Sequence, residues 1–134
     1  MAPMKKTTLR RSLALVEAAM VVPLLLMLLL GLLEYGWIFI RAQQVTNAAR
    51  HGARIGALAD STDEEVLGAI AGWMNRAGIS DYTVSPEPLG VEGFASGDTL
   101  TVTVVAGNIR IIGVPLLPAP DTLRASVSMA KEGP

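Results

Sequence analysis

The sequence predicts an α+β protein in which one long N-terminal transmembrane helix extends into a small outer domain. A 28-residue apolar stretch, Leu13 to Ile40, contains only two charged residues. A helix-capping signal with helical spacing follows near residue 61, and from residue 81 apolar and polar residues alternate as in half-buried strands. We therefore expect a basic cytoplasmic leader over residues 1–12, a transmembrane helix over 13–40, and an outer domain over 41–134 with a second helix and a short antiparallel sheet.

The composition argues against several classes of function. The chain has no cysteine, so neither disulfides nor thiolates for catalysis or zinc binding are available. With a single histidine, no glycine-serine elbow and no phosphate-binding glycine loop, we expect no enzyme, no cofactor and no small-molecule substrate. Nucleic acid is not an expected partner, because only six aromatic residues are available for base stacking.

Four basic residues lie just before the apolar stretch: Lys5, Lys6, Arg10 and Arg11. Residues 1–54 carry a net charge of +5, whereas residues 55–134 carry −6. By the positive-inside rule, this distribution predicts an N-terminus in the cytoplasm and an acidic domain outside. The basic residues serve topology alone or also take part in recognition.

The apolar stretch is long enough to serve as a permanent anchor. Ala18 to Leu33 are 16 residues without a charge, and Ala18 to Trp37 cover the roughly 30 Å hydrocarbon layer at about 1.5 Å per residue. The uncharged run exceeds the usual h-region of a removable signal peptide. Tyr35, Trp37 and Phe39 form an aromatic group where the outer interface is expected. The lipid bilayer is therefore an expected partner.

Three residues in this stretch are unusual for a plain anchor. Pro23 lacks an N–H and crowds the carbonyl of Ala19, so we expect a kink there, unless it is a tolerated membrane proline. Glu17, at the inner edge, either pairs with a cation or extends toward lipid headgroups. Glu34 lies one turn inside Trp37, where it is expected to extend outward to water.

The helix is expected to continue through residues 41–59, because this segment contains no proline. One face is polar and basic, with Gln43, Asn47, Arg50 and Arg54. A second face carries small side chains that permit close approach, either to the chain's own sheet, which we favour, or to a neighbouring copy; it consists of Val45, Ala49, Gly52, Ala53 and Gly56. His51 is expected to be a solvated helix residue.

The second helix is expected to begin at Ser61, which as N-cap would form a capping box with Glu64. Apolar residues follow at helical spacing, and Gly78 ends the helix; they are Val66, Ile70, Trp73 and Met74. The acidic run at residues 60–65 lacks the spaced ligands and central glycine of a calcium loop, so capping explains it better.

Three segments show the alternation of strands: 82–85, 99–104 and 123–129. A loop rich in glycine and proline, residues 86–97, separates the first two. Gly107-Asn108 either turns the second strand back into Ile109–Ile112 or begins a helix or irregular chain. The apolar segment 111–117 covers the core, which we favour, or touches the outer membrane surface.

Two groups of motifs extend the interpretation. The first group begins with Arg10-Arg11 and a small residue, Ser12. V-E follows four and five positions after Ser12, and V-P and a leucine run come next. The second is G-x-x-E-Y-G from Gly31 and Q-x-x-T-N-A-A-R-x-G-A-R from Gln43. In this order and spacing, residues 10–56 resemble the TadE-like family, the minor pilin-like proteins of the tight-adherence pilus system.

The resemblance implies a type IV pilin-like subunit of a pilus or secretion system, or pseudopilin, in the bacterial inner membrane. Its partners would be other pilin-like subunits, the assembly machinery and a prepilin peptidase that cuts before the apolar helix. The matching junction is Ser12–Leu13, where the family's usual residue before the cut is glycine. Glu17 would then be the fifth mature residue and pair with a neighbour's N-terminus during assembly. The alternative is a permanently anchored envelope protein whose outer domain binds another protein.

Overall fold

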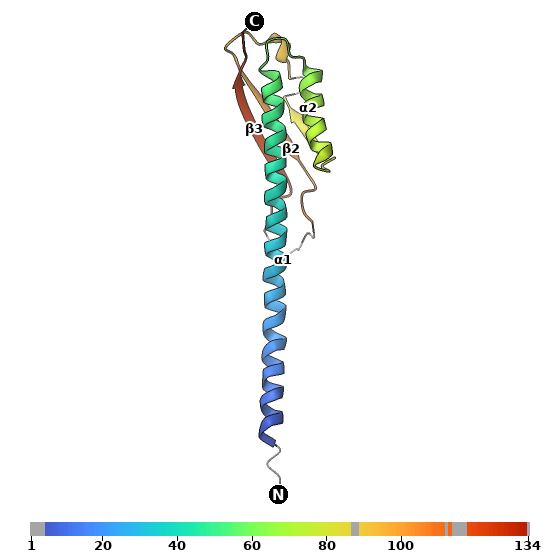
Figure 1. Cartoon of the computed structure of the whole chain (residues 1–134), viewed down its shortest axis with the longest axis vertical. Coiled ribbons are helices and arrows are strands. Elements are labelled where there is room, and N and C mark those ends of the chain that lie inside the picture. Colours follow the sequence, from blue (N-terminus) through green and yellow to red (C-terminus); the bar gives the residue numbers. More distant parts are fainter. Residues whose placement is uncertain (1–4, 87–88, 112, 114–117, 134) are drawn as a thin grey trace.

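The computed structural model describes the backbone of residues 5–86, 89–111, 113 and 118–133, with side chains in the first helix described from Ala14 onward. Its elements follow in the order α1 (Lys5–Gly56), α2 (Asp63–Arg76), β1 (Tyr82–Ser85), the 3-10 turn η1 (Val91–Gly93), β2 (Thr99–Ala106) and β3 (Leu123–Ala130). Figure 1 shows the other elements gathered around the C-terminal part of α1. This is the predicted α+β layout, with a long N-terminal helix and a three-stranded antiparallel sheet.

Helix α1 is continuous over 52 residues. At about 1.5 Å per residue it is roughly 78 Å long, more than twice the thickness of a hydrocarbon layer. It passes through Pro23 in helical conformation and continues beyond residue 40 into the outer domain, as expected from the lack of proline there. One helix therefore forms both the apolar stalk and a wall of the domain.

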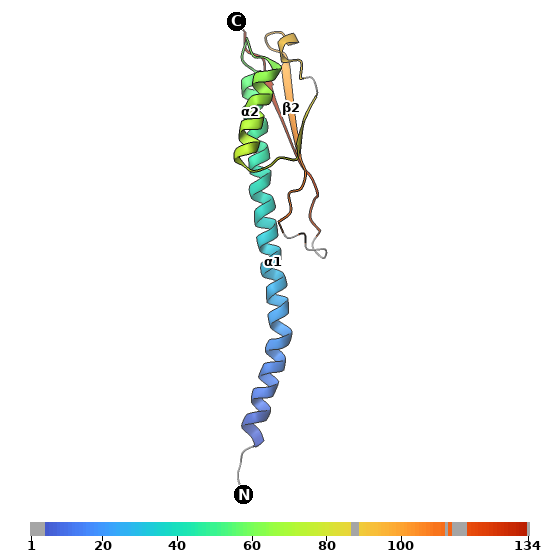
Figure 2. The ribbon, with the colours of Figure 1, turned by 90° about the vertical axis from the view of Figure 1, so that its right-hand side faces the viewer.

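The domain has two layers: α1 and α2 lie side by side over one face of the sheet, as Figures 1 and 2 show from two directions. Its core joins both helices to β2, through residues that are almost completely buried. They include Ala49 and Ala53 of α1, Ile70 and Met74 of α2, and Leu100 and Val102 of β2. The small face of α1 therefore packs within the chain, which is the alternative we favoured.

Strand β2 is the centre of the sheet and pairs antiparallel with β1 on one side and β3 on the other. Leu100, opposite Met129, and Val102, opposite Val127, point into the core. On the other face, two pairs of hydroxyl groups join β2 to β3: Thr101 with Ser128 at 2.8 Å, and Thr103 with Ser126 at 2.7 Å. The predicted alternation of the strands is confirmed.

The N-cap of α2 differs by one residue from the prediction. Thr62, not Ser61, caps the helix: its hydroxyl accepts from the Glu65 N–H, and the Glu65 carboxylate accepts from the Thr62 N–H. Both Ser61 and Thr62 have a glutamate three residues later, so the local pattern fits either register. Ser61 is instead 5% exposed and lies against the end of α1.

The segment after β2 does not form a fourth strand within its described residues. Asn108 has a positive φ of 49°, and residues 107–111 are irregular. Ile109 is buried, whereas Ile111 is 55% exposed, so Ile111 does not belong to the core. The remainder of the apolar segment, residue 112 and residues 114–117, lies outside the described residues.

Candidate functional site

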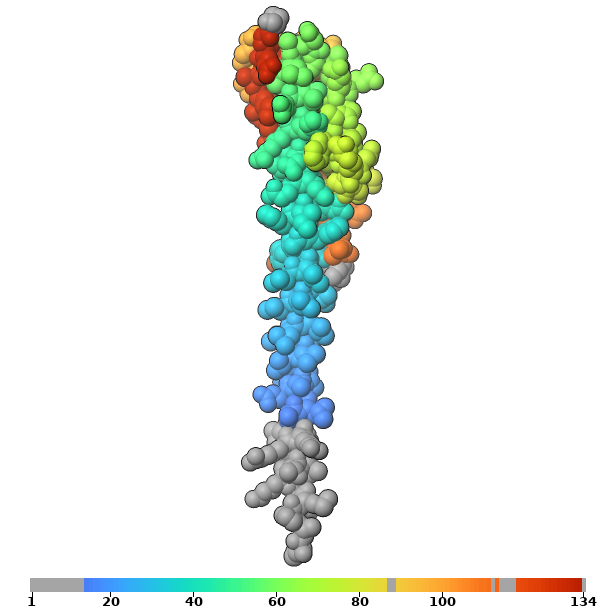
Figure 3. Space-filling view, in the orientation of Figure 1, coloured from blue at the N-terminus to red at the C-terminus, as the bar shows by residue number. Residues whose placement is uncertain are grey.

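The N-terminal half of α1 is an apolar surface that the outer domain leaves uncovered. From Leu15 to Leu33, the large apolar side chains are between 38% and 75% exposed. Figure 3 shows this part of α1 below the domain, with no other element covering it on the visible face. By length and composition α1 can cross a membrane. Because so much contiguous apolar surface is unfavourable in water, it requires lipid or other helices around it.

The basic leader and the expected cleavage junction lie at the start of α1. The backbone is helical from Lys5, so Ser12–Leu13 is within the helix. The side chains of Lys5, Lys6, Arg10, Arg11, Ser12 and Leu13 lie outside the described residues, and their roles stay predictions. The bend expected at Pro23 also stays a prediction.

Glu17 is exposed on the surface of α1. Among the described residues it has no hydrogen-bond or ion-pair partner. A carboxylate in an otherwise apolar surface is costly to keep in lipid, and a cation supplied from outside the described part of the chain would stabilise it. This exposure leaves Glu17 able to accept such a partner.

The environment of Glu34 differs from the one that the sequence predicted. It does not extend to water: the residue is 1% exposed, and its Oε1 accepts a hydrogen bond of 3.1 Å from the N–H of Ile111. On the next residue of α1, the Tyr35 hydroxyl donates to the carbonyl of Pro118 at 2.6 Å. The segment after β2 thus returns along α1 and supplies a backbone donor to this glutamate, a long-range contact with no local sequence signal.

Two arginines hold the surroundings of this contact in place. Arg110 pairs with Asp121 at 3.0 Å and donates to the carbonyl of Ala119, so it joins the two ends of the returning segment. Arg41 lies over the Trp37 ring at 4.5 Å. Its guanidinium also donates to the carbonyl of Ala77, at the C-terminal end of α2. Arg41 therefore fixes the end of α2 against α1, whereas Arg110 holds the two ends of the returning segment together.

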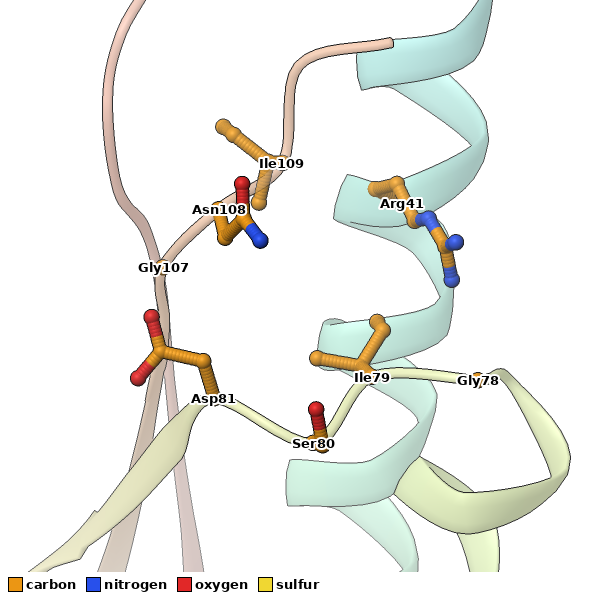
Figure 4. Close-up of a pocket in the computed structure, with 8 residues that line it drawn as sticks. All are labelled: Arg41, Gly78, Ile79, Ser80, Asp81, Gly107, Asn108 and Ile109. Atoms are coloured by element: carbon orange, nitrogen blue, oxygen red, sulfur yellow. The ribbon is translucent and has the colours of Figure 1, made fainter.

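A small polar pocket lies beside Arg41, between α1, the end of α2, and the segments next to β1 and β2. Its volume of about 50 Å³ is far below the roughly 300–1,000 Å³ of small-molecule sites. In Figure 4, the charged groups of Arg41 and Asp81 point away from each other, with Ile79 between them. The described residues contain no group of three or more histidines and acids that could hold a metal.

The C-terminal end of α1 is held by a buried lysine that the sequence did not indicate. Lys131 is 5% exposed, and its Nζ donates to the carbonyl of Gly56 at 3.1 Å and to Ser61 Oγ at 2.8 Å. The backbone N–H of the following residue, Glu132, donates to the carbonyl of Ala57 at 2.7 Å. A cation at the negative end of the helix dipole satisfies carbonyls that have no partner within the helix. The C-terminus of the chain is thereby attached to the end of α1.

The polar face of α1 points outward as predicted, with Gln43, Asn47, Arg50 and Arg54 all exposed. Arg50 and Arg54 form no ion pair with a described residue. His51 is half-buried rather than freely solvated, because its ring stands edge-on to Trp73 at 5.9 Å. That contact spans α1 and α2.

Comparison with known protein families gives a match for the N-terminal helix. The family model described as TadE-like protein matches residues 13–54, from the expected cleavage junction almost to the end of α1. No curated protein and no solved structure shows a significant match. The matched segment contains both the uncovered apolar half of α1 and the small-residue face in the core. The match confirms the resemblance drawn from residues 10–56: residues 13–54, most of α1, are similar to the TadE-like family.

Proposed function

We propose that the protein is a minor pilin-like structural subunit of a tight-adherence pilus. It is held in the bacterial inner membrane by α1, with residues 1–12 in the cytoplasm and residues 41–134 outside. The observation that carries this proposal is the uncovered apolar half of α1, in the segment that matches the TadE-like family. Lipid covers this surface first, and the helices of other pilin-like subunits replace lipid on assembly.

The proposal assigns a role to each end of the uncovered half. Lys5, Lys6, Arg10 and Arg11 keep the leader in the cytoplasm. A prepilin peptidase cuts between Ser12 and Leu13, which creates an α-amino group one helical turn before Glu17.

Glu17 then pairs with the α-amino group of a neighbouring subunit, and its exposure on α1 leaves it accessible for this contact. Pro23 frees the carbonyl of Ala19 and allows α1 to bend where subunits pack against each other.

The test is removal of the Glu17 carboxylate in two forms, Glu17→Ala and Glu17→Gln. Both variants stay in the membrane, because a glutamate costs up to about 3 kcal/mol in the hydrocarbon layer and its removal favours insertion. Both fail to enter sheared pili, since neither side chain carries the charge that pairs with an amine. Glu64→Ala, which removes an exposed carboxylate from α2, is the matched control and assembles normally.

Two results would contradict the proposal. Normal incorporation of Glu17→Ala into pili would remove the assembly role of Glu17. An intact N-terminus by mass analysis, both with and without the peptidase, would favour the alternative of a permanently anchored envelope protein whose outer domain binds another protein.

A further inference from the structure

The segment that follows β2 brings part of the outer domain down to the stalk. Figure 2 shows this segment leaving the sheet and running beside α1 toward the uncovered half. Two hydrogen bonds attach it there: from the Ile111 N–H to Glu34, and from the Tyr35 hydroxyl to the Pro118 carbonyl. Ile111 is therefore held at the level of Glu34 along α1.

This level coincides with the outer edge of the hydrocarbon layer. Twenty helical residues cover its roughly 30 Å thickness. If the embedded window is residues 14–33, the layer ends one residue before Glu34; if it is 18–37, the layer ends just beyond it. In both cases Ile111 lies within about one helical turn, 5.4 Å, of the boundary.

The surface at this level is apolar, with charge above it. Ile111 is 55% exposed and lines an open groove whose other walls come from α1: Leu32, Leu33, Gly36, Trp37 and Ile40. Charged groups lie on the side of the outer domain, where Arg41 covers Trp37 and Arg110 pairs with Asp121. An apolar surface bordered by an aromatic ring and arginines is typical of a membrane interface.

We propose that this groove is a second membrane contact, in which Ile111 and the adjoining face of α1 engage acyl chains of the outer leaflet. Glu34 is the positioning residue, because its carboxylate holds the Ile111 backbone at this depth. The contact rests on the proposed insertion of α1. It fixes the outer domain against the bilayer through a second point, and it explains how a glutamate near hydrocarbon is shielded by the protein's own backbone.

The test uses the absence of native cysteine, which allows a single fluorescent label at any site. Full-length Ile111→Cys carries a polarity-sensitive dye and is reconstituted in vesicles of phosphatidylcholine and phosphatidylglycerol. Two nitroxide lipids are used: one labelled near the headgroup end of its acyl chain, which quenches dyes at the edge of the layer, and one labelled near the terminal methyl, which quenches dyes at its centre. Leu25→Cys, in the uncovered half, reports insertion, and Thr101→Cys, on the exposed outer face of the sheet, reports water.

We expect loss of fluorescence at position 111 with the nitroxide near the headgroup end, at position 25 with the nitroxide near the terminal methyl, and at position 101 only with aqueous iodide. In the Ile111→Cys background, Glu34→Gln retains an acceptor for the N–H and keeps the lipid quenching, whereas Glu34→Ala loses it. If position 25 responds to nitroxide lipids but position 111 behaves like position 101, the second contact is refuted while insertion stands. If position 25 also responds only to iodide, insertion and the contact are both refuted. Unchanged quenching in Glu34→Ala would refute the positioning role.

Discussion

Gly52→Ala tests whether the small face of α1 is committed to its own domain. A Cβ at Gly52 would lie 2.6 Å from both Cγ1 and Cδ1 of Ile70, and ordinary contact begins at 3.4 Å. Either the Ile70 side chain or one of the two helices must therefore shift by about 0.8 Å. Ile70 is fully buried, and buried side chains are generally close-packed with little room to move. Overpacking of this kind costs about 1–3 kcal/mol.

The matched control is Gly72→Ala in α2, where a new Cβ meets nothing within 4 Å. Both substitutions gain the same helix propensity, up to about 1 kcal/mol, because glycine is replaced by alanine inside a helix. The difference between the two variants therefore isolates the packing cost. We expect Gly52→Ala to be less stable than Gly72→Ala by about 1–3 kcal/mol.

The assay is urea unfolding of the full chain in detergent micelles, with Trp37 replaced by Phe so that the fluorescence followed is that of Trp73. Trp73 lies on α2 and contacts His51 of α1, so its signal reports separation of the two helices. A second substitution, Ile70→Val, removes Cδ1 and should recover part of the loss when combined with Gly52→Ala. Equal stability of Gly52→Ala and Gly72→Ala would refute the reasoning and leave this face free to meet another copy.

Two further substitutions test the ends of the helices by the same unfolding assay. Lys131→Met removes both hydrogen bonds that Nζ donates at the end of α1. We expect the free energy of unfolding to fall by about 1.5–3 kcal/mol. Wild-type stability would mean that Ser61 alone satisfies the Gly56 carbonyl. Thr62→Ala removes the N-cap of α2 and should cost about 1 kcal/mol, whereas an equal loss in Glu64→Ala would favour the capping box predicted from Ser61.

The parts of the structure that the sequence predicted depend on contacts close in sequence. The apolar stretch and the absence of proline from residues 41–59 predicted one helix from the stalk into the domain, and α1 extends to Gly56. Alternation of Leu100 and Val102 with threonines predicted which face of the strand is buried, and the structure confirms it. The spacing of apolar residues and the distribution of charge depend only on residues close in sequence, so these predictions required no knowledge of the fold.

The parts that the sequence did not predict depend on contacts between distant residues. Glu34 looked like a glutamate at a membrane interface, because nothing nearby indicates that the Ile111 N–H, 77 residues later, bonds to it. Ser61 and Thr62 both fit a capping box, but the Ser61 hydroxyl is bonded instead to the Gly56 carbonyl and to Lys131, which lies 70 residues later in the chain. Lys131 itself lies between Ala130 and Glu132, with no sequence pattern that marks it as buried.

On the proposed function, α1 crosses the membrane with its first half and contributes to the core of the outer domain with its second. Single cysteines at Leu25, Ala49 and Arg50, treated with a membrane-impermeant maleimide on spheroplasts, test both halves together. Arg50 is exposed and its neighbour Ala49 is fully buried. We predict reaction at position 50 alone, with positions 25 and 49 reacting only after detergent and urea. Reaction at position 25 on intact spheroplasts, or protection of position 50, would contradict the claim.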